Sequence, residues 1–457
     1  MYDYLDSNHL IHPNHHGFLK NSSTSSALQH IFDIWLQHLD KGKLSAALFL
    51  DLSAGFDVIN HELLLLKMKE YNFSEDTISW FSSYLLDRSQ CVQVESSFSP
   101  ILPVPWGVPQ GSILGPLLFL FFINELPDIV KERHGENSHE NAAGTDEEIV
   151  IYADDNTLTT ADKDPIDLQS KVQNEANLVT SWFSKNDMIC SSDKTKLLVI
   201  GTKANRQSKL TGPNITLGVN VCGEDKQESS SEKLLGVVVN NIGTFKHHLY
   251  GDEENDGLLK QLSTRVGMLK RLKRFMSPAR LKLLMEGIFS SKLTYGMTVW
   301  GRVWQIPGNT DDEIRSPSLT KEDIRKLQVL QNKCLRIVSN SDYSTPTKTL
   351  LQKTRCLSVH QQIAQLSLSQ VYNISKTRSP AYHYQRLFTP SNNPHPGARS
   401  FGANRIDFKL SLARSHFFYQ SSRLWAAIPE SIKSSRNKTI FKKRCKAWVQ
   451  SNVLVKP

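Results

Sequence analysis

Two short apolar segments that carry aspartate at or near their ends constrain this chain more than any other feature. Residues 46–52, Ala-Ala-Leu-Phe-Leu-Asp-Leu, are apolar except for Asp51, a pattern typical of a strand buried on both faces. Residues 149–153, Ile-Val-Ile-Tyr-Ala, predict a second strand that turns at Asp154 and Asp155. An ionised carboxylate removed from water must be paired or bound to a cation. The sequence therefore predicts strands whose carboxylates require a cation.

Three carboxylates on two strands are able to hold two magnesium ions. The adjacent carboxylates of Asp154 and Asp155 repel each other unless a metal neutralises them. Two metals about 3.5–4 Å apart activate an attacking hydroxyl and stabilise the leaving oxygen of an in-line phosphoryl displacement. Each feature alone has an ordinary explanation, because an Asp-Asp pair is most often a solvated turn and Asp51 alone would serve as a strand-end cap.

A loop rich in glycine and proline lies between the two aspartate segments in the sequence. Residues 107–112 read Gly-Val-Pro-Gln-Gly-Ser. The glycines permit a close approach of the backbone, and the side-chain amide of Gln110 is able to position a nucleotide. The order of the three segments favours a metal-dependent nucleotide site over three unrelated turns.

These three segments resemble the palm motifs of reverse transcriptases from non-LTR retrotransposons, the long interspersed element type. Residues 49–57 (Phe-Leu-Asp-Leu-Ser-Ala-Gly-Phe-Asp) resemble the first motif, residues 107–116 the Gly-Val-Pro-Gln-Gly-Ser-x-Leu-Gly-Pro motif, and residues 152–155 the Tyr-Ala-Asp-Asp signature. Residues 193–196 resemble the lysine motif that follows, and residues 234–237 the hairpin that grips the primer. The resemblance extends over nearly the whole chain.

The resemblance implies an α+β fold: a right-hand polymerase palm with partial fingers, a helical thumb and a basic helical C-terminal extension. The regions implied are a reverse transcriptase domain over residues 1–245, a thumb over residues 246–310 and the C-terminal region over residues 311–457. The length of 457 residues, at about 150 residues per domain, likewise suggests about three compact units.

RNA-directed DNA polymerisation is the function that the resemblance implies, with deoxynucleotides added to a primer 3′ hydroxyl by two-magnesium catalysis. Asp51, Asp154 and Asp155 would be the catalytic residues and the ligands of the two Mg²⁺ ions, and Leu52 would lend a backbone carbonyl. Phe56 would close on the sugar 2′ position and disfavour ribonucleotides. Ordinary core packing is the alternative for Phe56.

The resemblance also implies residues that bind the incoming nucleotide. Gln110 and Gly111 would contact the deoxynucleoside triphosphate and the template. Lys194, or alternatively Lys196, would protonate or neutralise the departing pyrophosphate. A lysine after a strand turn is more often simply solvated.

Charge is divided unevenly along the chain. Residues 1–160 contain 8 Lys or Arg and 22 Asp or Glu, a net charge of −14, whereas the remaining residues contain 46 and 23, a net charge of +23. Residues 259–272 predict an amphipathic basic helix, and Lys270, Arg271, Lys273 and Arg274 at its end are expected to contact an RNA template and a DNA primer. Such binding weakens steeply with salt. A solvated charged face and a membrane surface are the alternatives.

The cysteines and the apolar runs bear on location. Six cysteines stand without paired spacing, which indicates a reducing, intracellular compartment, and nuclear residence is an expectation from the family's chromosomal target. The longest apolar run, residues 113–123, is far shorter than the roughly 20 residues that a bilayer requires, so no membrane partner is expected.

Two polar segments are expected to lie outside the compact regions. Residues 131–148 predict an acidic surface insertion, and residues 305–320 predict a linker. Nothing in the sequence indicates an oligomeric state.

The sequence departs from the family in its finger segment. Leu19 follows Gly17 and Phe18 where the family carries an arginine, and Lys20 lacks the planar two-point grip of arginine on phosphate. Because the sequence begins inside the fingers, we expect an N-terminally truncated copy with weakened synthesis. A catalytically inactive nucleic-acid-binding remnant of such a polymerase is the alternative function. A helical interaction protein with no nucleic-acid role is disfavoured by the three motifs.

Overall fold

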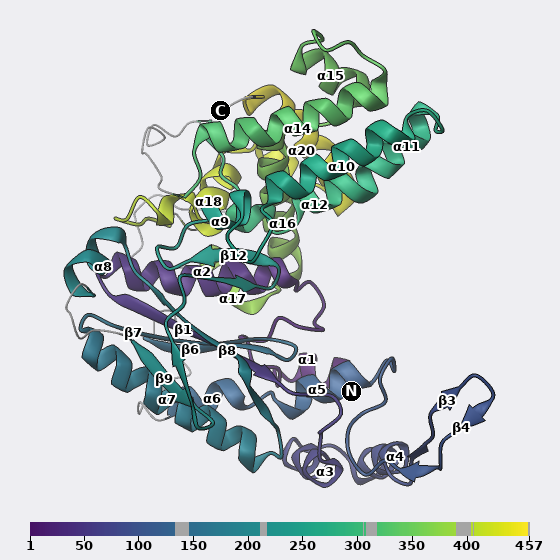
Figure 1. Ribbon diagram of the computed structural model, residues 1–457, viewed down its shortest axis with the longest axis vertical. Coiled ribbons are helices and arrows are strands. Elements are labelled where there is room, and N and C mark those ends of the chain that lie inside the picture. Colours follow the sequence, from purple (N-terminus) through teal and green to yellow (C-terminus); the bar gives the residue numbers. More distant parts are fainter. Residues whose placement is uncertain are drawn as a thin grey trace. The chain divides into compact units, whose positions relative to one another are not determined.

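Two compact units make up the part of the chain that the computed structural model describes (Figure 1). The described residues are 1–132, 146–210, 217–304, 306–307, 318–389, 404 and 406–455. The first unit comprises Met1–Lys20, Ser45–Val199 and Lys209–Glu228, and the second comprises Asn21–Leu44, Ile200–Ser208 and Ser229–Pro457. Each unit therefore combines segments that are distant in the sequence. The division at residues 245 and 310 describes functional regions and stays a prediction.

A four-stranded sheet with the order β6-β7-β1-β8 is the centre of the first unit. Its strands are β1 (Leu44–Leu52), β6 (Glu147–Tyr152), β7 (Asp155–Asp162) and β8 (Cys190–Ile200). Seven of the nine residues of β1 are buried, and β6 is buried except at its last residue. This burial explains the continuous apolar runs and confirms both predicted strands.

Two helices cover one face of this sheet (Figure 1). The helix α6 (Leu126–Glu132) packs against β6, and α7 (Pro165–Lys185) packs against β7. Asp164 accepts hydrogen bonds from the first backbone amides of α7, and Pro165 occupies its first position, as is common at helix starts. The other elements of the unit are α1 (Tyr2–Ser7), α3 (His61–Glu70), α4 (Glu75–Leu85), α5 (Gly115–Phe122), β9 (Gly218–Val221) and β10 (Glu224–Gln227).

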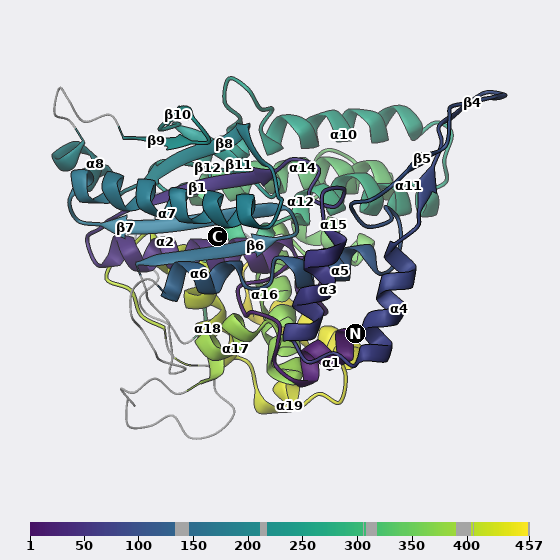
Figure 2. The same ribbon diagram turned by 90° about the horizontal axis from the view of Figure 1, so that it is seen from below.

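A narrow β-ribbon extends from the end of α4 (Figure 2). It consists of β2 (Ser89–Gln90) paired with β5 (Leu102–Pro103), and β3 (Gln93–Val94) paired with β4 (Ser97–Phe98). All eight strand residues are exposed, so the ribbon adds little to the core of the unit.

Helices dominate the second unit. The helix α16 (Val359–Thr377) packs against α14 (Lys321–Ser339), α18 (Phe417–Ala427) and α20 (Lys438–Asn452). The helices α10 (Leu258–Leu272) and α11 (Pro278–Met285) pack against α14. The remaining elements are α2 (Thr24–Asp40), α8 (Lys203–Lys209), β11 (Ser231–Leu234), β12 (Val237–Asn240), α9 (Lys246–Tyr250), the π-helical turn η1 (Glu286–Ser290), α12 (Ser291–Thr294), α13 (Met297–Trp300), α15 (Thr347–Thr354), α17 (Ala381–Phe388), the 3₁₀ turn η3 (Ala413–Ser415) and α19 (Glu430–Lys433).

Several predicted elements of the second unit have simple outcomes. The basic helix is confirmed as α10. The apolar pattern of residues 233–239 taken alone predicts a single strand, and this prediction is wrong, because Leu235 and Gly236 turn the chain between β11 and β12. The turn lies within residues 234–237, which resemble the hairpin of the family. Most of the predicted acidic insertion, residues 133–145, and most of the predicted linker, residues 305 and 308–317, lie outside the described residues. None of the described helices is both long and apolar enough to span a bilayer.

Candidate active site

A tight hairpin loop between β6 and β7 positions two of the predicted catalytic carboxylates. Tyr152 pairs with Asp155, so Ala153 and Asp154 are the two loop residues. Ala153 has φ +57°, whereas Asp154 does not have a positive φ. A positive φ at the first position of a two-residue loop suits the right-handed twist of the paired strands. The loop thereby presents Asp154 and Asp155 next to each other at the end of the sheet.

An N-terminal segment of the same unit supports this hairpin. The backbone amide of His16 donates to the carbonyl of Ile151 at 2.9 Å, and the Ile151 amide donates to the carbonyl of Asn14 at 3.0 Å. A Cβ atom on Gly17 would lie 2.3 Å from the backbone nitrogen of Ala153. Only glycine permits this approach, so the backbone contact alone explains why residue 17 is glycine, without any contact with substrate.

The side chains of Asp51, Asp154, Asp155 and Lys194 influence one another electrostatically. Asp51 lies near the end of β1, the neighbour of β7 in the sheet, and its side chain is 27% exposed. Lys194 on β8 places its Nζ 3.1 Å from Asp51 Oδ1. The pKa of Asp155 is raised to about 6, by desolvation first and then by the negative charges of Asp154 and Asp51, while Lys194 lowers it. The structure thus brings the three predicted carboxylates within electrostatic range.

Accumulated negative charge is the property that suits this cluster to a divalent cation. Mg²⁺ in phosphoryl-transfer sites takes one or two carboxylates, and substrate phosphates and water complete its octahedron. Within the described residues no group of three or more His, Cys, Asp or Glu side chains encloses a metal position. Asp51 and Asp154 or Asp155 are therefore able to hold a magnesium ion only together with oxygens from outside this set, such as those of a bound nucleotide.

Replacing Asp155 with asparagine is expected to remove a pH-dependent loss of stability in metal-free buffer. Because the folded-state pKa is raised, the folded chain binds the proton more tightly than the unfolded chain between about pH 4 and 6. The free energy of unfolding therefore falls as pH rises through this range and stays low above it. The loss is about 1 kcal/mol, because solvent reaches the Asp155 side chain and weakens both the desolvation and the repulsion that raise its pKa.

Urea unfolding with EDTA at several pH values measures this loss, and magnesium should restore the parent above pH 6. Asp167→Asn, in the first turn of α7, is the control and should retain the parental pH dependence. An unchanged pH dependence in Asp155→Asn would contradict the electrostatic account.

The loop with the Gly-Val-Pro-Gln-Gly-Ser sequence is anchored to the segment that follows β1. A Cβ atom on Gly107 would lie 2.6 Å from the backbone oxygen of Asp57, so this contact requires glycine. The Gln110 amide donates to both carboxylate oxygens of Asp57 at 2.9 Å. Gly111 has φ +76° with open space beside it. Sequence reasoning identified Gln110 and Gly111 but missed Asp57 as the residue that orients the amide.

Phe56 and Leu52 differ in how far they are accessible. Phe56 is half-buried and stacks on Phe119, with ring centroids 4.5 Å apart, and it meets Phe18 edge-on at 5.9 Å. Core packing therefore accounts for one face of the Phe56 ring. Leu52 is 2% exposed, so only its backbone is a candidate for contact with a ligand. The two roles that the resemblance implies for these residues stay predictions.

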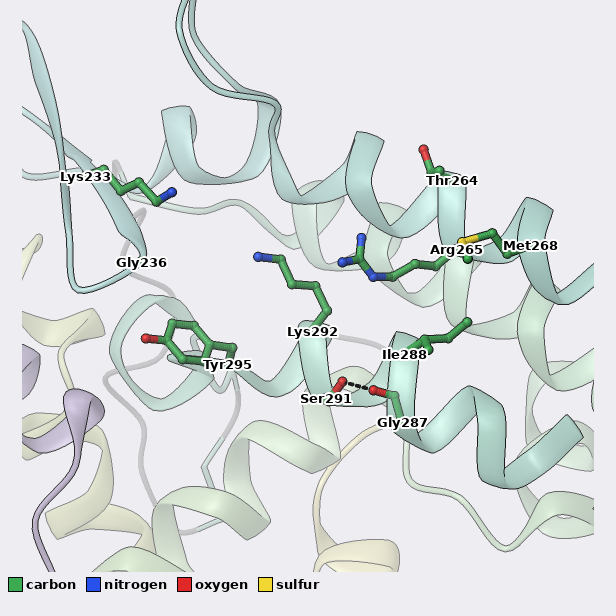
Figure 3. Close-up of a pocket in the computed structure, with 10 residues that line it drawn as sticks. All are labelled: Lys233, Gly236, Thr264, Arg265, Met268, Gly287, Ile288, Ser291, Lys292 and Tyr295. Atoms are coloured by element: carbon green, nitrogen blue, oxygen red, sulfur yellow. Dashed lines mark hydrogen bonds between the residues drawn. The ribbon is translucent and has the colours of Figure 1, made fainter. Parts of the chain in front are cut away.

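A basic pocket lies within the second unit, between the β11–β12 turn and the helices α10 and α12 (Figure 3). Its volume is about 710 Å³, and the side chains of Lys233, Arg265 and Lys292 point into it. The hydroxyl of Tyr295 donates to the carbonyl of Leu235 at 2.7 Å and fixes the turn.

Three cationic side chains lie close together in this pocket. In the part of the chain that the structure describes, Lys233, Arg265 and Lys292 form no salt bridge with Asp or Glu. The pKa of Lys292 is lowered, by desolvation first and then by the positive charges of Arg265 and Lys233. A phosphate group would relieve this repulsion.

The predicted nucleic-acid-binding cations occupy a different position from this pocket. Lys270, Arg271, Lys273 and Arg274 are exposed at the end of α10 and do not line it. Sequence periodicity found the basic helix but missed Lys233 and Lys292, because they lie on separate elements that only the fold brings together.

Comparisons with known proteins provide independent information. The family model described as "Reverse transcriptase (RNA-dependent DNA polymerase)" matches residues 1–239. The RNA-directed DNA polymerase from mobile element jockey of Drosophila melanogaster is 24% identical over 337 residues, covering 73% of this chain and 32% of the relative. The probable RNA-directed DNA polymerase from transposon BS of the same species is 25% identical over 353 residues, covering 77% and 35%. The chain spans about a third of the length of these curated relatives.

Solved structures resemble this chain only weakly. Apo telomerase from Candida tropicalis has a TM-score of 0.40 at 12% identity, covering 83% of this chain and 58% of that chain. Telomerase from Candida albicans in complex with a TWJ fragment of telomeric RNA has a TM-score of 0.34 at 13% identity, covering 84% and 56%. The strands and helices described above establish the α+β class.

Proposed function

Because the chain belongs to the reverse transcriptase (RNA-dependent DNA polymerase) family, we propose that it adds deoxynucleotides to a primer 3′ hydroxyl under the direction of an RNA template. Its relatives are polymerases of mobile elements, which confirms the predicted resemblance to non-LTR retrotransposons. In this proposal the sheet of the first unit is the polymerase palm, and the helices that follow β12 include the thumb.

The mutual electrostatic influence of Asp51, Asp154 and Asp155 is the observation that carries this proposal. Asp51 and Asp154 would hold two magnesium ions, with Asp155 beside them. When bound, such ions supply activation of the primer hydroxyl and stabilisation of the departing pyrophosphate. Lys194, now paired with Asp51, would turn its ammonium group toward the pyrophosphate and offer it a proton.

The loop of residues 107–112, which is anchored to Asp57, would position the nucleotide. The carboxylate of Asp57 fixes the Gln110 amide, and a fixed amide offers directed hydrogen bonds to a nucleotide or template base. Gly111 leaves open space for close approach of a ligand to the backbone. Phe56, held by Phe119, would limit the room at the sugar 2′ position.

Magnesium-dependent extension of a DNA primer on an RNA template by the full chain is the direct test. Incorporation that requires both the template and magnesium supports the proposal. Retained binding of the primer–template duplex without any incorporation, in the parent chain, would instead support the inactive binding remnant.

Removing the cations of the basic pocket is expected to weaken binding of an RNA–DNA duplex. The plot of log affinity against log salt has a negative slope, and each lost phosphate contact should make it shallower by about one, so Arg265→Ala with Lys292→Ala should make it shallower by about two. Fluorescence anisotropy with a labelled duplex at several salt concentrations measures this slope.

Two further variants make the binding measurement specific. Lys348→Ala removes an exposed cation from α15 and should leave the slope unchanged. Lys270→Ala with Arg271→Ala tests the predicted cations at the end of α10 separately. Equal slopes for the parent and the double pocket variant would show that the pocket does not bind the duplex.

A further inference from the structure

A second hairpin of the first unit lies beside the start of β8. Glu228, just after β10, forms a parallel bridge with Leu197 of β8. Because the bridge is parallel, β10, which precedes Glu228, lies on the side of the first residues of β8, which precede Leu197. Val221 pairs with Glu224 across a two-residue turn of Cys222 and Gly223, which have φ +52° and +86°. Two positive φ values are typical of the tight turns that match strand twist.

The electrostatics of the side chains agree with this placement. The pKa of the Glu224 carboxyl is lowered, first by Lys226 and then by the side chain of Ser192, the third residue of β8. The Sγ of Cys190, the first residue of β8, contacts the Thr195 hydroxyl at 3.8 Å, and the nearby side chain of Cys222 adds to the increase in the Cys190 pKa that burial causes. Cys222 is exposed and Cys190 is half-buried, and neither is disulfide-bonded. The turn therefore holds one accessible thiol against a second, less accessible thiol.

We propose that Cys190 and Cys222 form a modification site, at which a low-molecular-weight disulfide such as oxidised glutathione converts the two thiols into a disulfide bond. The inference rests on the backbone placement of the β9–β10 turn beside the start of β8 and does not depend on polymerase activity. A bond here would lie on the strand that carries Lys194, the partner of Asp51. Oxidation would thereby add a covalent bond to the strand that borders the carboxylate cluster.

The two steps of the reaction balance. The Cys222 thiolate attacks one sulfur of oxidised glutathione, and one glutathione thiolate leaves. The Cys190 thiolate then attacks the Cys222 sulfur of this mixed disulfide, and the second glutathione leaves. In total the protein loses two protons and two electrons, and one oxidised glutathione becomes two reduced glutathiones.

Exposure and acidity assign the order of the two thiols. Cys222 is accessible to a dissolved oxidant, whereas burial, more than any other cause, raises the pKa of Cys190 to about 11. Only the thiolate attacks a disulfide, so Cys190 is the slower, resolving partner. A mildly alkaline buffer speeds this second step.

Incubation of the full chain with oxidised glutathione, followed by alkylation and digestion without reductant, tests the proposal by mass spectrometry. The expected product is a peptide pair joined through Cys190 and Cys222, with both thiols lost and no glutathione retained on Cys222. In Cys190→Ser the reaction should stop at the first step and leave glutathione on Cys222. Cys91→Ser removes another exposed thiol of the first unit and should leave the crosslink intact.

Two outcomes would overturn the proposal. One is persistent glutathione on Cys222 in the parent chain while Cys190 stays alkylated. The other is a Cys190–Cys222 crosslink no more abundant than the crosslinks of either residue with Cys91. Because every readout is a covalent mass, a chain that fails in primer extension still gives a clear result here.

Discussion

Asp154→Ala is expected to lower the rate of primer extension about a thousandfold, which corresponds to about 4 kcal/mol of lost transition-state stabilisation. Asp154 is one of two residues in the β6–β7 loop, and its charge acts on Asp155 together with that of Asp51. Removing it takes away one of the carboxylates that would hold a magnesium ion and leaves Asp51 and Asp155 to bind the ion with fewer oxygens. A single-turnover primer-extension assay measures the rate.

Controls separate this chemical effect from a loss of folding. Asp154→Asn keeps the shape of the side chain and should lose activity to a similar extent, while both variants retain the parental affinity for the primer–template duplex. Asp167→Asn should extend the primer at the parental rate. Equal rates for the parent and Asp154→Ala would refute the catalytic assignment.

Arg386→Met is expected to lower the free energy of unfolding by about 3–5 kcal/mol, because it leaves a buried carboxylate without its cation. The side chain of Asp33 on α2 is 0% exposed, and Arg386 on α17 donates to it at 2.8 Å. The Tyr382 hydroxyl and the Gln37 amide donate to the same oxygen at 2.8 and 3.0 Å. Urea unfolding followed by circular dichroism measures the change.

Two companion variants make the stability test specific. Arg325→Met removes an exposed arginine that pairs with Glu322 on the same helix, and it should change stability little. Asp33→Asn combined with Arg386→Met removes both charges and should recover part of the loss. If Arg386→Met were no more destabilising than Arg325→Met, the buried Asp33–Arg386 pair would not stabilise the fold more than an exposed pair does.

Local apolar patterns predicted most of the secondary structure. The apolar runs at β1 and β6 are strands because both faces are covered, and the leucine stripe of α10 is a helix because one face packs on α14. The β11–β12 turn escaped periodicity, since Leu235 and Gly236 adopt positive φ within an otherwise strand-like run. The alternation of apolar and polar residues does not predict a backbone turn at an apolar residue such as Leu235.

The carboxylate cluster was within reach of sequence reasoning, whereas its surroundings were not. Asp51 interrupts an apolar strand and Asp154 and Asp155 are adjacent, so their chemistry is visible in the sequence. The contact of Asp57 with Gln110 joins residues 53 positions apart, and Lys233 meets Lys292 only through the fold. Such partners depend on tertiary packing, which a single sequence does not reveal.

Assembly of the carboxylate cluster depends on contacts between very distant parts of the chain. Lys194 lies 143 residues after Asp51, and β7 and β8 are the two neighbours of β1 in the sheet. During synthesis at about 5–20 residues per second, β1 therefore waits on the order of ten seconds for its second neighbour. Until then one edge of an almost wholly apolar strand has no neighbouring strand, and an unpaired apolar edge exposes a nascent chain to aggregation.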